Sequence, residues 1–215
     1  MLSNRIITIA QGAFMKKCII LIGHAYDTLC LSGVVNHDME ENVISENLRE
    51  LMSQDSFSSS NGIMVAREQP INNGNLLSST QSADALPRID FKFQKSWSMM
   101  QHTFFSFFEA KNLYANDFKK TGNSSKTSAK ASHKRYVEKG IQHVLSGYYL
   151  STTCMLGYVL EGTISDAVNG VNTQISSILS PNEILQPRQT PYPTLSSYVS
   201  IHDQGSVMSH LMMQF

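Results

Sequence analysis

The pattern of apolar and polar positions alternates between a helical and an extended period along the chain. Apolar side chains recur at helical spacing in four segments, which predicts helices at about 6–31 (as one or two helices), 39–52, 133–150 and 163–179. Extended apolar runs predict strands at 63–67, 87–93, 104–114 and 152–160. Two alternating runs, 195–202 and 207–215, flank the turn 203–205 and predict a hairpin at the edge of a sheet.

Polar segments separate these elements. They predict a turn at 56–62, loops at 72–84, 94–103 and 116–132, a linker at 181–193, and a cap at 36–38 for the second helix. Strands that alternate with helices in 215 residues favour a single α/β domain, 1–215, with a mixed central sheet flanked by helices. The N-terminal helical segment, about 1–35, is expected to pack against this core.

The run 104–114 carries the residues with the clearest chemistry. It is rich in Phe and predicts a strand that is buried on both faces. Side chains two positions apart on a strand point to the same face, so Glu109 and Lys111 lie together. An antiparallel hairpin with the run 87–93 would place Asp90 opposite Glu109. The pattern therefore predicts two carboxylates and one amine at one place on the sheet.

Two carboxylates beside an ammonium group are suited to hydrolysis with a hard divalent cation. Mg²⁺ prefers oxygen ligands and is commonly held by one or two carboxylates together with phosphate oxygens. Asp90 and Glu109 are the expected ligands, and Mn²⁺ is an alternative to Mg²⁺. The amine of Lys111 would orient or polarise the attacking water and stabilise charge on the phosphate.

These residues resemble the PD-(D/E)xK nuclease superfamily, whose fold many restriction endonucleases share. The match consists of Asp90, with Pro87 three positions earlier, and the tripeptide Glu109-Ala110-Lys111. The blocks 136–141, 147–149 and 155–159 look like the helix and strand that follow the catalytic strand in bacterial members. The resemblance covers about 38–215 and implies a restriction-endonuclease-like fold, in which a right-handed crossover places 152–160 beside 104–114.

The resemblance implies two further site residues. Many members carry an acidic residue on a helix before the first strand, and Glu41 occupies that position, where it would complete the metal shell. The dipole of a helix N-terminus, which favours acidic residues, explains Glu41 equally well. A glutamine on the later helix touches the site in several branches, and Gln142 is the candidate here. A surface glutamine without a role is the alternative.

Basic residues are concentrated just after the predicted catalytic strand, although the formal net charge of the chain is zero. The candidates for contact with DNA phosphates are Lys119, Lys120, Lys126, Lys130, Lys134 and Arg135. A phosphate backbone would lie along such a stretch if it borders the site. A solvated loop is the alternative.

Cysteine usage and hydropathy predict a cytoplasmic protein. Three scattered cysteines suit neither a disulfide framework nor a zinc site. The apolar run after Lys16 and Lys17 is interrupted by Gly23 and His24, so neither export nor membrane insertion is expected.

The sequence thus predicts a Mg²⁺-dependent endonuclease that cuts DNA in restriction or defence against foreign DNA. A two-fold homodimer is common where both strands are cut. One alternative is a nuclease-fold protein that no longer cuts and serves as a nucleic-acid-binding or assembly subunit. Another is a metal-free domain in which Asp90, Glu109 and Lys111 form only an ion-pair cluster.

Overall fold

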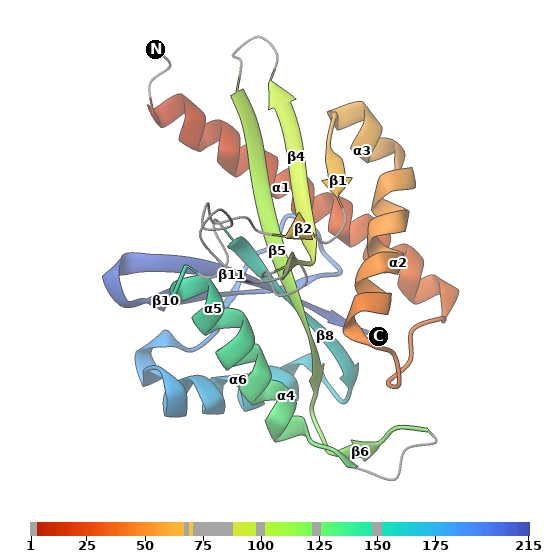
Figure 1. Cartoon of the computed structure of the whole chain (residues 1–215), viewed down its shortest axis with the longest axis vertical. Coiled ribbons are helices and arrows are strands. Elements are labelled where there is room, and N and C mark those ends of the chain that lie inside the picture. The colour runs from red at the N-terminus through yellow and green to blue at the C-terminus, as the bar shows by residue number, and fades with distance from the viewer. Residues whose placement is uncertain (1–3, 67–68, 71–87, 98–101, 122–125, 148–151) are drawn as a thin grey trace, which may run out of the picture.

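The computed structural model describes residues 4–66, 69–70, 88–97, 102–121, 126–147 and 152–215. A central sheet with helices on both faces organises this part of the chain (Figure 1). Its strand order is β1-β4-β5-β8-β11-β10-β9. The strands are β1 (Met64–Ala66), β4 (Phe91–Trp97), β5 (His102–Tyr114), β8 (Thr152–Glu161), β9 (Gln186–Arg188), β10 (Ser196–His202) and β11 (Ser206–Gln214). β8 pairs in parallel with β5 and β11, and the other pairs are antiparallel. The predicted α/β class with a mixed sheet is confirmed.

Two helical layers cover the sheet. The helices are α1 (Asn4–Ser32), α2 (Glu41–Gln54), α3 (Ser56–Asn61), α4 (Ala129–Arg135), a π-helix (Tyr136–Ile141), α5 (Gln142–Leu145) and α6 (Ile164–Ile178). Apolar side chains of α1 and α2 share one core with alternate residues of β5 and β8, such as Phe108 and Tyr158. The π-helix and α6 share a second core with the intervening residues, such as Leu113 and Val159. Successive residues of β5 and β8 therefore place apolar side chains on both faces of the sheet. This is expected for a sheet that helices cover on both sides.

Helix α1 is a single helix, which agrees with the predicted helix at 6–31. It is long and apolar enough to cross a membrane, a property shared by core helices of soluble proteins and by signal sequences. Phe14, Cys18, Ile22 and Leu29 are buried in the first core. Phe14 lies with its ring centroid 6.1 Å from that of Phe104 on β5.

The hairpin of β4 and β5 is antiparallel as predicted, with Phe91 opposite Phe108 and Trp97 opposite His102. The predicted loop at 94–103 is wrong at both ends, because β4 continues to Trp97 and β5 begins at His102. Polar Gln94 and Lys95 are half-buried strand residues, and their polarity alone indicated a loop. The predicted loop 72–84 and Pro87 lie outside the described residues.

Two other polar segments are more regular than predicted, and one predicted cap is wrong. The expected turn at 56–62 is helix α3, which Asp55 caps by accepting a hydrogen bond from the N–H of Phe57 and which Gly62 ends in a left-handed conformation. The expected loop at 116–132 contains β6 (Phe118–Lys119), β7 (Lys126–Thr127) and the start of α4. The expected cap at 36–38 is wrong, since Glu40 precedes α2 and makes no capping bond with its side chain.

The expected linker at 181–193 contains a 3₁₀ turn (Pro181–Glu183) and the edge strand β9, which pairs with β10. The β10–β11 hairpin is therefore confirmed as a hairpin, but its expected place at the edge of the sheet is wrong. A second small pair joins β2 (Gln69–Pro70) to β3 (Arg88–Ile89).

The segment after β5 crosses over one face of the sheet and returns as β8, parallel to β5 and directly beside it, as predicted. The predicted continuous helix at 133–150 is interrupted by the six-residue π-helix. The wider π turn is a local irregularity that helices often adopt where a side chain must be redirected. Residues 148–150, including Tyr148 and Tyr149, lie outside the described residues.

Candidate active site on β5

The site lies where β5 extends beyond the end of its partner strand β4. Pairing of β4 with β5 ends at Phe91 and Phe108, yet β5 continues to Tyr114. Backbone N–H groups along a strand edge need acceptors. The N–H of Ala110 donates to Asp90 Oδ2 at 2.7 Å, and the N–H of Asn112 donates to Glu41 Oε2 at 3.0 Å. Two carboxylates thus occupy the position of a neighbouring strand along this stretch, which we call the β5 edge (residues 110–112).

Asp90 lies in the short break between β3 and β4. Its neighbours Ile89 and Phe91 are fully buried, so the backbone is fixed on both sides of the carboxylate. Burial raises the pKa of Asp90 well above its ordinary value, and the nearby Glu109 carboxylate raises it further. The carboxylate of Asp90 therefore favours a proton or a cation beside it.

Lys111 joins the acidic residues. Its Nζ lies 2.5 Å from Glu109 Oε1 and 3.1 Å from Glu41 Oε1, and it also donates to the carbonyl oxygen of Ala110 at 2.6 Å. Lys111 and Glu109 are both buried. Burial lowers the pKa of the Lys111 amine, but the carboxylates of Glu109, Glu41 and Asp90 outweigh burial and raise it. The amine is therefore a positively charged ammonium group at neutral pH.

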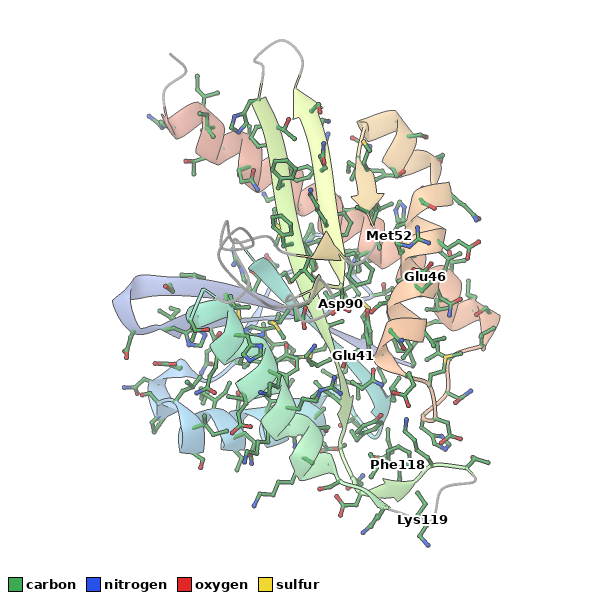
Figure 2. All side chains as sticks on the ribbon, viewed as in Figure 1. Glu41, Glu46, Met52, Asp90, Phe118 and Lys119 are labelled. Atoms are coloured by element: carbon green, nitrogen blue, oxygen red, sulfur yellow. The ribbon has the colours of Figure 1, made fainter. Side chains whose placement is uncertain are left out.

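Glu41 is the first residue of α2, at the end of the helix that lies beside β5 (Figure 2). One carboxylate oxygen accepts from Asn112, and the other contacts both Lys111 and Nη2 of Arg135, the latter at 3.4 Å. The helix N-terminus favours an acidic residue here, but these contacts show that Glu41 also belongs to the cluster. We call Glu41, Asp90, Glu109 and Lys111 the carboxylate–lysine cluster.

Asp90, Glu109 and Lys111 are thus brought together, as the strand pattern predicted, and Glu41 joins them. Within the described residues, no group of three or more His, Cys, Asp or Glu side chains is positioned to hold a metal ion. The ammonium of Lys111 contacts both Glu41 and Glu109. The donor set nevertheless suits a hard cation in kind, because carboxylate oxygens of Glu41, Asp90 and Glu109 lie around the β5 edge.

The basic candidates divide into two groups. Four form ion pairs, namely Lys120 with Glu40, Lys126 with Asp117, Lys134 with Glu138 and Arg135 with Glu41. Lys119 and Lys130 are exposed and form no ion pair with any described residue. Lys119 extends from the β6–β7 hairpin, away from Asp90 (Figure 2). Glu40 and Glu41 are distant in the chain from the basic residues that they pair with, whereas Asp117 and Glu138 belong to the same segment.

Gln142 lies apart from the carboxylate–lysine cluster. It lines an open surface pocket together with Glu138, Lys139, Ser146 and Leu179. The adjacent His143 is close enough to the cluster for Lys111 to lower its pKa, after the larger effects of burial and Lys139. The helix that carries Gln142 therefore lies near the site. Among the described residues, the Gln142 side chain forms no hydrogen bond with the carboxylate–lysine cluster.

Tyr158 of β8 is a neighbour of the site that the sequence did not single out. Its hydroxyl shares a 3.0 Å hydrogen bond with Ser45 of α2 and is fully buried. Burial raises the pKa of this phenol, and Asp90 is the strongest charged contributor. A tyrosine within an otherwise apolar strand is the only sequence signal, and it did not distinguish a site neighbour from a core residue.

Comparison with known proteins gives no independent assignment of this cluster. No family model, curated protein or solved structure matches the chain. Its chemistry is therefore argued from the geometry of the β5 edge.

Proposed function

We propose that the protein is a Mg²⁺-dependent endonuclease with a restriction-endonuclease-like fold, which hydrolyses phosphodiester bonds in DNA. The observation that carries the proposal is that Glu41 and Glu109 contact Lys111 at the β5 edge, while Asp90 accepts a hydrogen bond from the adjacent N–H of Ala110. A role in restriction or phage defence, a cytoplasmic location without membrane insertion, and a two-fold homodimer belong to the same proposal.

The path of the chain supports the finer fold assignment. Helix α2 bears the acidic residue and precedes β1, the β4–β5 hairpin bears Asp90 and the Glu-x-Lys tripeptide, and a helical crossover leads to the parallel strand β8. This is the arrangement that the resemblance to PD-(D/E)xK nucleases implies for the residues it covers.

The cluster suggests separate roles for its members. Asp90 and Glu109 would hold Mg²⁺ or Mn²⁺, with Glu41 completing the shell, and the cation would supply positive charge and lower the pKa of a bound water. Lys111 is held as an ammonium by its carboxylate neighbours. It is therefore suited to orient the attacking water and to stabilise charge on the phosphate, and is not suited to act as a base.

DNA is the proposed substrate because exposed basic residues lie after β5. Lys119 and Lys130 are available for phosphates, and Arg135 links the same segment to Glu41. On binding DNA, three other lysines would exchange carboxylate partners for phosphates, namely Lys120, Lys126 and Lys134. Loss of those ion pairs lowers their contribution to the free energy of DNA binding.

A catalytically silent nucleic-acid-binding or assembly subunit is the second candidate. One observation favours it: the ammonium of Lys111 already bonds Glu41 and Glu109, which neutralises part of the charge that would attract a cation. The two candidates differ in whether the cluster binds a divalent cation.

Calorimetric titration of the metal-free protein with Mn²⁺ separates them. The proposal predicts saturable binding that Asp90→Asn or Glu109→Gln weakens at least about tenfold, since loss of a carboxylate removes a hard ligand. Glu50→Gln is the matched control, because Glu50 is an exposed carboxylate of α2 remote from Lys111. Absence of Mn²⁺ binding, together with retained DNA binding, would favour the silent subunit.

A further inference from the structure

A second buried polar network lies on the opposite side of β8 from β5. Tyr136 Oη lies 3.0 Å from His210 Nδ1, and His210 Nε2 lies 2.8 Å from Ser200 Oγ. Ser200 Oγ lies 2.7 Å from His202 Nε2, and His202 Nδ1 lies 2.7 Å from Glu183 Oε2. We call these five side chains the relay. All five are buried.

Three members have the connectivity of a hydrolase triad, with Ser200, His202 and Glu183 in the order hydroxyl, imidazole, carboxylate. Ser200 is only 1% exposed, however, and its hydroxyl is shared with a second imidazole, that of His210. A substrate carbonyl could not reach this oxygen. The relay therefore serves the folded chain rather than a second reaction.

One assignment of donors and acceptors satisfies every member when Glu183 is ionised and both imidazoles are neutral. An ionised Glu183 only accepts, so His202 Nδ1 carries a hydrogen and its Nε2 accepts from Ser200. Ser200 in turn accepts from His210 Nε2, and His210 Nδ1 accepts from the hydroxyl of Tyr136. Every buried member is then satisfied without an added proton. Burial and the nearby His202 lower the pKa of His210 to about 3, in keeping with a neutral ring.

Tyr136 connects this network to the carboxylate–lysine cluster. It is the first residue of the π-helix, and the preceding Arg135 contacts Glu41. Further along the π-helix, Gly140 lies so close to the sheet that an added Cβ would be 2.3 Å from Met155 Cε and 4.0 Å from Lys111 Cγ. The π-helix is therefore tied to β11 at Tyr136 and lies against β5 and β8 at Gly140.

We propose that the relay positions the π-helix, through Tyr136, so that Arg135 holds the carboxylate of Glu41 at the β5 edge. Tyr136 is a positioning residue, and Glu183, His202, Ser200 and His210 fix it. The inference rests on the proposed function only in treating the cluster as a divalent-cation site.

The test uses Tyr136→Phe, which removes one hydroxyl from a buried ring. Tyr198→Phe is the matched control, since Tyr198 of β10 packs against the same core and its hydroxyl forms no described hydrogen bond. Nitrogen NMR of the imidazoles reports on the relay, and the amide signal of Asn112 reports on Glu41, whose carboxylate accepts that N–H.

In Tyr136→Phe we expect altered ring-nitrogen signals for His210, a shifted Asn112 amide and about tenfold weaker Mn²⁺ binding, the size usual for loss of a group that supports metal ligands. Tyr198→Phe, a change directly opposite His210 on the neighbouring strand, should leave the Asn112 amide and Mn²⁺ binding unchanged. Altered His210 signals with an unchanged Asn112 amide would overturn the proposal.

Substitutions of Glu183, at the other end of the relay, test the proposal even if Tyr136→Phe does not fold. Glu183→Ala removes the terminal acceptor and should shift the Asn112 amide in the same way, whereas Glu183→Gln retains an oxygen acceptor and should stay close to wild type. Equal effects of Ala and Gln at position 183 would contradict the relay. If the wild-type protein itself binds no Mn²⁺, the proposed nuclease function fails, and the Asn112 amide still decides the relay.

Discussion

Asp90 accepts a hydrogen bond from the N–H of Ala110 at 2.7 Å, just beyond the point where β4 and β5 stop pairing. The carboxylate replaces the carbonyl of a neighbouring strand, and this position leaves it half-buried near Glu109. The same contact therefore completes the hydrogen bonding of the β5 edge and creates an unfavourable concentration of negative charge. A proton or a divalent cation would relieve that repulsion.

The stability of the metal-free protein should consequently depend on the ionisation of Asp90. An acid whose folded pKa is raised contributes stability at low pH and loses it as the pH rises through the folded pKa, at about 1.4 kcal/mol for each unit of pKa difference. Wild type in EDTA should therefore lose stability above about pH 4, the ordinary range of an aspartate. Asp90→Asn should lack this loss, because the amide oxygen still accepts from Ala110. Urea unfolding between pH 4 and pH 8 measures the difference.

The control for this comparison is Asp203→Asn, a change at an exposed carboxylate on the turn before β11. It should follow the wild-type curve. If the free energy of unfolding changes with pH in the same way for wild type and Asp90→Asn, ionisation of Asp90 is not the cause of the loss of stability.

Lys111→Met should destabilise the protein by about 3 kcal/mol or more, because removal of one partner leaves Glu109 as a buried charge without its ammonium. Adding Glu109→Gln should restore part of that loss, since the amide needs no counter-charge. Lys16→Met, at an exposed position of α1, is the control and should change stability little. Chemical denaturation at neutral pH without metal measures wild type and these variants together with Glu109→Gln alone, and an additive double variant would argue against direct coupling.

Binding of duplex DNA should depend most on the basic residues without acidic partners. Lys119→Ala and Lys130→Ala should each weaken binding and reduce the slope of log affinity against log salt by about one unit. Lys126→Ala should have a smaller effect, because Lys126 is paired with Asp117. Fluorescence anisotropy across a salt series measures these slopes.

Arg188→Ala is the control for the DNA measurement. Arg188 is exposed on β9, at the edge of the sheet opposite β1. A slope change for Arg188→Ala equal to that for Lys119→Ala would mean that DNA binds without preference for the segment after β5.

Much of the fold could be predicted because the apolar pattern is strong where the structure is buried on both sides. The Phe-rich run of β5 and the parallel strand β8 are examples, and alternation alone placed Glu109 and Lys111 on one face. Helix α3 was missed because its sequence, SFSSSN, has one apolar side chain and is held by Asp55 and Gly62 at its ends. Strand β9 was missed because it is three exposed residues that include Pro187.

The part of the site that could be predicted is formed by residues close together in the sequence. One hairpin brings Asp90 near Glu109, whereas the contacts of Glu41 with Lys111, Asn112 and Arg135 join residues 70 to 94 positions apart. The relay was not foreseen, because its five members lie on four separate elements. Ion pairing of Lys120 with Glu40 likewise depends on a contact between residues 80 positions apart, which the charge pattern does not contain.

Cleavage of unmodified duplex DNA tests the central claim most directly. Wild type should cut a set of sequences only when Mg²⁺ or Mn²⁺ is present, and Asp90→Asn and Glu109→Gln should each reduce the rate by at least about 100-fold, equivalent to about 2.7 kcal/mol of lost transition-state stabilisation. Glu50→Gln should cut at the wild-type rate. Wild-type protein that binds duplex DNA and leaves it uncut with either metal, or equal cutting by wild type and Asp90→Asn, would contradict the account.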